Sequence, residues 1–131
     1  MSDRLILDTC AIIWLALGGK SMSKSALEAV RTADPVYVSP ISAWEISMKY
    51  ERGSIELPMA PLEWFSRILV SHDLTLAPLD VETLIASNAL PWHHKDPADR
   101  FIIATAMRLR LAIVTGDKLF SKYDIPIIPA N

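Results

Sequence analysis

Short apolar runs alternate with amphipathic segments along the whole chain. The apolar runs are bounded by turn residues, which is typical of buried strands. We expect strands over residues 4–7, 36–38, 74–77, 112–115 and 127–128. The segments between them have helical spacing and end in cap or stop residues. We expect helices over about 10–17, from the cap Ser23 to the break at Asp34-Pro35, and over about 41–52, 61–71, 81–89, 97–110 and 118–123.

This order of elements favours one fold class. Short buried strands that alternate with helices indicate a parallel sheet covered on both faces. We therefore expect an α/β fold, a three-layer α/β/α sandwich around a mostly parallel sheet of about five strands. No repeat, low-complexity segment or linker divides the sequence, so we expect a single domain over residues 1–131.

The helix that begins at Pro97 carries an acidic residue on the side that faces the core. Pro97 suits the first position of the helix, and Asp96 precedes it as the cap. At 100° per residue, Asp99 shares a face with Ile102 and Ile103. We therefore expect the Asp99 carboxyl group to point toward the interior.

Other acidic residues follow predicted strands. Asp8 comes directly after the first strand, and Asp117 follows the late strand over residues 112–115. In parallel α/β folds, ligands bind beyond the carboxyl ends of the strands. Together with Glu45 in the third helix, we interpret Asp8, Asp99 and Asp117 as parts of one metal pocket.

A purely structural interpretation of these acids is also open. Asp8, Asp96 and Asp117 each precede a predicted helix, and aspartate is a favourable N-cap. Asp99 lies in a first helical turn, where a negative charge interacts well with the helix dipole. Taken one at a time, all four acids are explained by helix capping and helix electrostatics.

Glu45 caps nothing, because it lies in the middle of its helix. It sits at the edge of an apolar stripe formed by Ile41, Trp44 and Met48. Glu45 is therefore either a surface glutamate paired with Lys49 four residues later, or a member of the pocket. Helical geometry alone leaves the two interpretations equal.

Composition limits the classes of protein that remain. The apolar fraction is 51% and the charged fraction 21%, which excludes a disordered chain. The net charge of −2 means that any contact with nucleic acid requires a local basic rim. A single cysteine, Cys10, excludes a cysteine-rich zinc site. With neither a signal peptide nor a membrane-spanning run, we expect a cytoplasmic protein without membrane contact.

Four segments in a fixed order resemble those of a known family. The chain resembles PIN-domain ribonucleases of the VapC type, the toxin half of type II toxin–antitoxin pairs. The matching segments are Leu7-Asp8-Thr9, Ser39-Pro40-Ile41-Ser42-Ala43-Trp44-Glu45-Ile46, the stretch from His94 to Ala106 with Asp96-Pro97-Ala98-Asp99-Arg100 at its centre, and Val114-Thr115-Gly116-Asp117 with Leu119-Phe120.

The resemblance implies a function and a set of site residues. It implies a metal-dependent endoribonuclease that is a homodimer and is held inactive by a cognate VapB-like antitoxin. The implied catalytic residues are Asp8, Glu45, Asp99 and Asp117, of which Asp8, Asp99 and Asp117 are the metal ligands. The implied supporting residues are Thr115, Asp96 and Thr9, with Asp96 a cap first and a ligand second.

The residue types fit this chemistry. Converging carboxylates repel one another unless a cation neutralises them, and a set of oxygen ligands favours Mg²⁺ or Mn²⁺. Such an ion lowers the pKa of a bound water and stabilises the oxyanions of phosphodiester hydrolysis. An acid outside the metal's ligand set, Glu45 or Asp117, is a candidate base for the attacking water.

Basic residues near the acidic motifs are candidate contacts to RNA or to the antitoxin, although each also fits a solvated helix face. They are Lys49, Arg52, Lys95, Arg100 and Lys118. The histidines His93 and His94 precede Asp96 in a loop, where we expect them at the surface. Two other functions remain open: a Mg²⁺-binding phospho-acceptor signalling domain, and a catalytically silent PIN module that grips a partner.

Overall fold

The structure, a computed structural model, describes residues 4–131. Twelve elements follow one another in the order that the sequence predicts. They are β1 (Leu5–Leu7), α1 (Thr9–Ala16), α2 (Lys24–Thr32), β2 (Val36–Val38), α3 (Pro40–Glu51), α4 (Pro61–Ser71), β3 (Leu74–Leu76), α5 (Val81–Ala89), α6 (Pro97–Leu109), β4 (Ala112–Thr115), η1 (Lys118–Lys122) and β5 (Ile127–Pro129). The last short helix, η1, is a 3₁₀ helix.

The five strands form one sheet in the order β3-β2-β1-β4-β5, and every pair is parallel. Strand β1 therefore lies in the centre, with β4 beside it although the two are far apart in the sequence. Leu7 at the end of β1 is in register with Val114 in β4. The residues that follow, Asp8 and Thr115, consequently emerge side by side at the carboxyl edge of the sheet.

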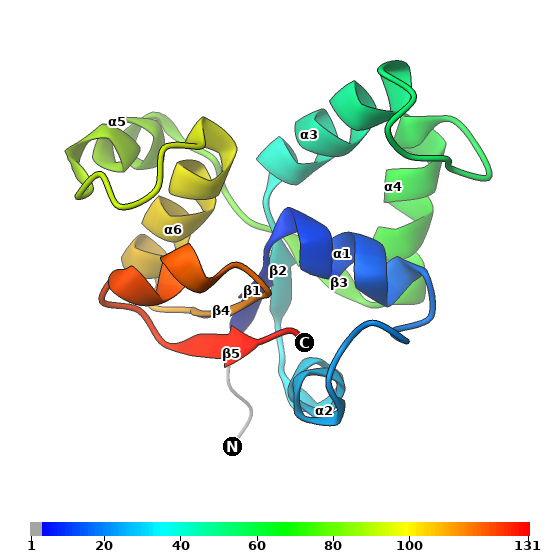
Figure 1. Cartoon of the computed structure of the whole chain (residues 1–131), viewed down its shortest axis with the longest axis horizontal. Coiled ribbons are helices and arrows are strands. Elements are labelled where there is room, and N and C mark those ends of the chain that lie inside the picture. The colour runs from blue at the N-terminus through cyan, green and yellow to red at the C-terminus, as the bar shows by residue number, and fades with distance from the viewer. Residues whose placement is uncertain (1–3) are drawn as a thin grey trace.

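Helices cover both faces of this sheet (Figure 1). Leu5 and Leu7 of β1 point toward α1, α2 and α4, and pack there with residues such as Ile12 and Phe65. Ile6 points to the opposite face and packs against α6. The alternation along β1 therefore builds two hydrophobic cores, one on each side. This confirms the expected three-layer α/β/α sandwich.

The third helix, α3, presents a different face to the core than its apolar stripe suggests. Ser42, Glu45 and Ile46 are its buried residues, whereas Trp44 is 56% exposed. Of the stripe formed by Ile41, Trp44 and Met48, Trp44 therefore lies largely outside the core of the chain. Two polar side chains, Ser42 and Glu45, are buried in this helix instead. Their hydrogen bonds with Thr9 make this burial possible.

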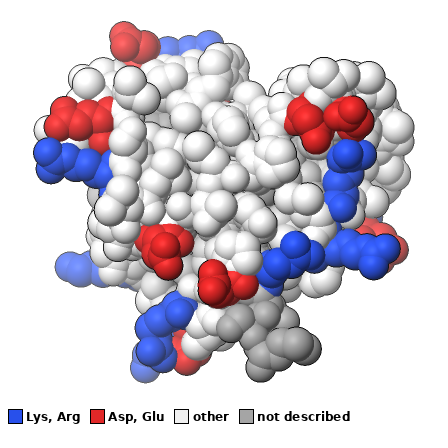
Figure 2. Space-filling view, turned by 180° about the vertical axis from the view of Figure 1, so that it is seen from behind, with Lys and Arg blue, Asp and Glu red and all other residues white. Residues whose placement is uncertain are grey.

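The surface opposite to that of Figure 1 carries its charges at the margins. Figure 2 shows Lys, Arg, Asp and Glu side chains around the edge of this face, and a centre that is largely uncharged. No broad basic field covers this side of residues 4–131, in line with the net charge of −2. Within the same residues, no helix combines the length and apolar character that crossing a bilayer requires.

Candidate active site

Asp8 serves both as a helix cap and as part of the site. Its Oδ1 accepts a hydrogen bond from the Ala11 backbone N–H at 2.8 Å, which caps α1. Its Oδ2 accepts one from the Thr115 hydroxyl at 2.6 Å. Burial raises the pKa of Asp8, these two bonds oppose the rise, and repulsion from Asp117 and Glu45 adds to it. The structural and functional interpretations of Asp8 are therefore compatible.

Glu45 points into the fold from the middle of α3. The residue is 8% exposed, and its Oε1 accepts a hydrogen bond from the Thr9 hydroxyl at 2.6 Å. Since the Thr9 proton is directed to Glu45, the Ser42 hydroxyl donates to Thr9 Oγ1 at 2.9 Å. This chain of hydroxyl groups holds the glutamate inside the fold rather than on a solvated rim beside Lys49.

Asp99 shows most clearly that the acids converge. It lies in the first turn of α6, and its side chain is 18% exposed. Burial and the negative charges around it raise the pKa of Asp99 from 3.8 to about 8. After burial, the repelling groups are, in order of strength, Asp96, Glu45, Asp8 and Asp117. Acids from three distant parts of the chain, together with the neighbouring Asp96, thus act on one carboxyl group.

Asp117 follows β4 and is fixed in three ways. Its Oδ1 accepts from the Leu119 backbone N–H at 2.9 Å and so caps η1. Its own backbone N–H donates to the Thr115 hydroxyl at 3.0 Å. Its Oδ2 lies 2.8 Å from His94 Nε2. Thr115 therefore connects Asp117 to Asp8 through a single hydroxyl group.

His94 is a site residue that the sequence did not reveal. The expectation of a surface position is correct for His93 but wrong for His94, which is 6% exposed. Its Nε2 lies 2.8 Å from Asp117 Oδ2 and 3.1 Å from Asp99 Oδ2. One candidate ligand atom from each of these three residues lies within 4.8 Å of the others. The position of His94 two residues before the helix cap Asp96 was the one sequence signal for its role. Because His93 stands next to it, the sequence does not show which of the two rings points into the fold.

The remaining predicted residues fall into two groups. Asp96 caps α6 by accepting from the Ala98 N–H at 3.0 Å, and it is exposed near Asp99. Arg100 does not reach the surface, since it is 2% exposed and its guanidinium group donates to backbone carbonyl oxygens. The prediction of Arg100 as a contact to RNA or to an antitoxin was therefore wrong. The other basic candidates are at least partly exposed, namely Lys49, Arg52, Lys95 and Lys118.

The donor set of this cluster fits a divalent cation. Within residues 4–131, the ion pairs made by the four acids involve His94 and no lysine or arginine. Buried carboxylates without a counter-charge destabilise a fold, and burial together with the neighbouring negative charges raises the pKa of Asp99. Carboxylate oxygens are the ligands that Mg²⁺ and Mn²⁺ prefer. A cation bound among Asp8, Asp99 and Asp117 would supply the missing positive charge.

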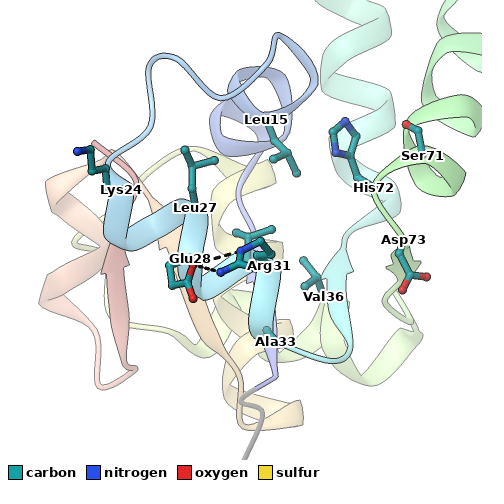
Figure 3. A pocket seen from close by; sticks show the side chains of 11 residues that line it. Leu15, Lys24, Leu27, Glu28, Arg31, Ala33, Val36, Ser71, His72 and Asp73 are labelled. Carbon is teal, nitrogen blue, oxygen red and sulfur yellow. Dashed lines mark hydrogen bonds and ion pairs between the residues drawn. The ribbon is translucent and has the colours of Figure 1, made fainter.

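The cavities of the molecule differ in chemistry. The largest, about 580 Å³, lies away from the acids between α1, α2 and the end of α4, with Leu15, Leu27 and the ion pair Glu28–Arg31 in its wall (Figure 3). A smaller cavity of about 360 Å³ adjoins the acids. It lies between α3 and α6, and its lining includes Glu45, Asp96, Trp44 and Phe101. A substrate at the acids would therefore have an apolar recess directly beside it.

Comparisons with known proteins agree with this arrangement. The family model described as "PIN domain" matches residues 5–126. Ribonuclease VapC22 of Mycobacterium tuberculosis is 30% identical over 123 residues, which are 93% of each chain. Among solved structures, VapBC2 from Rickettsia felis bound to a promoter DNA fragment has a TM-score of 0.73 and 12% identity, covering 98% of this chain and 99% of that one. A toxin–antitoxin complex from Klebsiella pneumoniae has a TM-score of 0.65 and 25% identity, covering 95% and 96%.

Proposed function

This chain belongs to the PIN domain family, and on that premise we propose that it is a metal-dependent endoribonuclease and the toxin of a toxin–antitoxin pair. The relative named as a ribonuclease supports the activity, and the toxin–antitoxin complexes among the similar structures support the partner. The observation that carries the proposal is geometric: the Thr115 hydroxyl contacts both Asp8 and the backbone of Asp117, and His94 Nε2 lies within 3.1 Å of both Asp99 and Asp117. Membership of this family also argues against the alternative of a phospho-acceptor signalling domain.

The acidic residues divide into two roles in this proposal. Asp8, Asp99 and Asp117 hold Mg²⁺ or Mn²⁺, which when bound activates water and stabilises negative charge on the phosphate oxygens. Glu45 lies beside them, and the Thr9 hydroxyl occupies its Oε1. Its Oε2 is therefore the atom that accepts the proton of the attacking water. The hydroxyl of Thr115 fixes Asp8 with a hydrogen bond and accepts one from the backbone of Asp117.

Binding of RNA then depends on residues around the acids rather than on the net charge. Lys49, Arg52, Lys95 and Lys118 are the basic side chains near the site that at least partly reach solvent, and we propose them as phosphate contacts. The apolar side chains on the surface provide area for a VapB-like antitoxin and for a second copy of the chain. Those exposed by more than half are Leu17, Trp44, Leu62, Val70, Val81, Ile85 and Trp92.

Cleavage of RNA by matched variants tests the proposal. Purified wild-type protein is incubated with total RNA in Mg²⁺ or Mn²⁺, and the cleavage sites are mapped by sequencing the new ends. Asp8→Asn keeps a good helix cap while removing the charge, so we expect a folded protein without cleavage. Asp99→Asn is expected to give the same loss, whereas Asp124→Asn, at an exposed position, retains full activity.

Two further results complete this test. A chelator such as EDTA is expected to stop cleavage by the wild type, and added Mn²⁺ to restore it. Expression of the wild type is expected to inhibit growth, and expression of Asp8→Asn is not. Undiminished cleavage by both the Asp8→Asn and Asp99→Asn variants would show that the acidic cluster is not the catalytic centre.

A further inference from the structure

Every polar atom of His94 has a hydrogen-bonding partner. Its backbone N–H donates to the Tyr123 hydroxyl at 2.9 Å, and its carbonyl oxygen accepts from Arg100 Nη1 at 2.9 Å. In the ring, Nδ1 accepts from the Asp96 N–H at 3.3 Å, and Nε2 lies 2.8 Å from Asp117 Oδ2. A histidine held by two bonds of its backbone and two of its ring has little freedom, although it belongs to a loop.

The groups that hold His94 are themselves anchored. The buried Arg100 guanidinium also donates to the carbonyl oxygens of Ser87, Leu90 and Pro91, at 2.7–3.0 Å. The Tyr123 hydroxyl donates to the Pro91 carbonyl oxygen at 2.6 Å. These bonds tie the loop after α5 to α6 and to the end of η1. The loop therefore presents the histidine ring in one defined orientation.

The partner of Nδ1 determines what Nε2 can do. A backbone N–H only donates, so Nδ1 must be an acceptor and the neutral ring carries its proton on Nε2. A protonated nitrogen has no lone pair for a metal ion. Nε2 therefore donates to Asp117 Oδ2 at 2.8 Å, and the same nitrogen lies 3.1 Å from Asp99 Oδ2.

We propose that His94 is a positioning residue that holds the carboxylates of Asp99 and Asp117 together to receive a divalent cation. These two acids come from different elements, since Asp99 lies on α6 and Asp117 follows β4. The Nε2–H of His94 fixes one oxygen of Asp117 by a hydrogen bond and places its positive edge 3.1 Å from one oxygen of Asp99. The ligand set of the ion stays all-oxygen, which suits Mg²⁺ and Mn²⁺. The inference rests on the proposed function, because it concerns the same metal site.

Hydrogen-bonding partners of metal ligands typically change metal affinity by 10- to 100-fold when they are lost. We therefore expect His94→Leu, which has no donor, to bind Mn²⁺ about 10- to 100-fold more weakly than the wild type. His94→Gln places an amide N–H near the position of Nε2 and is expected to recover most of the affinity. His93→Leu alters the neighbouring exposed histidine and is the matched control, with unchanged affinity.

The measurement is Mn²⁺ binding to the full chain without RNA, by electron paramagnetic resonance of the free ion. Circular dichroism establishes that each variant is folded. Should His94→Leu fail to fold, Tyr123→Phe takes its place. This variant removes the hydroxyl that binds the His94 backbone N–H but keeps the imidazole. We expect it to bind Mn²⁺ several-fold more weakly than the wild type. Pulsed measurements on the bound Mn²⁺ are expected to show no directly coordinated nitrogen.

Three results would overturn the inference, and they are distinguishable. Wild-type affinity in His94→Leu, or in Tyr123→Phe where that variant replaces it, would show that the histidine has no positioning role. A nitrogen bound directly to Mn²⁺ would make His94 a ligand instead. Absence of Mn²⁺ binding by the wild-type chain would overturn the metal dependence of the proposed function and the role of His94 with it. In the first two cases the proposed function stands.

Discussion

Replacing Asp99 by asparagine is expected to flatten the pH dependence of stability in the metal-free protein. The pKa of Asp99 in the folded chain is about 8, against 3.8 for an ordinary aspartate. Between these values the folded state holds a proton that the unfolded state has lost. The contribution of Asp99 to stability is therefore highest below about pH 4, declines as the pH rises toward about 8, and reaches its lower level above that.

The size of this effect follows from one proton. Each pH unit between the two pKa values lowers the free energy of unfolding by about 1.4 kcal/mol. From about pH 5 to about pH 7, the contribution of Asp99 is a loss of about 2.7 kcal/mol. The asparagine side chain of the variant has no proton to lose. The free energy of unfolding of the wild type and of the variant is compared as a function of pH. The difference between the two slopes reports Asp99 alone, because the raised pKa of Asp8 acts in the same direction in both proteins.

Urea denaturation in EDTA, followed by circular dichroism at several pH values, measures these slopes. Asp124→Asn, at an exposed position, is the control and is expected to follow the wild type. Adding Mn²⁺ to the wild type at about pH 7 should recover stability, because the ion offsets the repulsion that the raised pKa reports. Equal slopes for wild type and Asp99→Asn would refute the convergence of carboxylates on Asp99.

Two further substitutions test the supports of the site. Arg100→Ala leaves several buried carbonyl oxygens without a donor, so we expect a loss of about 3–5 kcal/mol in the free energy of unfolding. Urea denaturation measures this loss. The control is Arg108→Ala, at an exposed position, which is expected to change the free energy of unfolding little. Thr115→Val removes the hydroxyl that donates to Asp8, and we expect RNA cleavage to fall about 10- to 100-fold with the fold retained. Thr75→Val, at an exposed position, is its control, and equal rates for both threonine variants would contradict the role of Thr115.

The elements of this fold were predictable because their signals are local. Ser23, Asp8 and Asp96 cap their helices through bonds to backbone groups two or three residues away, so a short window contains both partners. The strands are apolar runs, since a parallel sheet covered on both faces needs no polar alternation. In α3 the local signal was insufficient, because the polar Glu45 is buried while the apolar Trp44 is exposed.

The site was predictable only where its residues stand at strand ends or match a family motif. Glu45 remained ambiguous, because its partner Thr9 is 36 positions away. His94 and Arg100 were missed for a related reason. The role of His94 depends on Asp117, 23 positions away, and Arg100 binds backbone carbonyl oxygens that carry no side-chain signature. Contacts of this kind exist only once the chain has folded.

The strand order has a consequence for how the protein is made. Strand β1 is translated before all the other described elements, but its neighbour β4 follows only after α6, and the Thr115–Asp8 bond spans 107 positions. A nascent chain on the ribosome therefore lacks the proposed pocket until β4 has been synthesised. A transcript broken before the codon for Ala112 yields a fragment without the central pairing. Such a fragment lacks Thr115 and Asp117, so the proposed site cannot form in it.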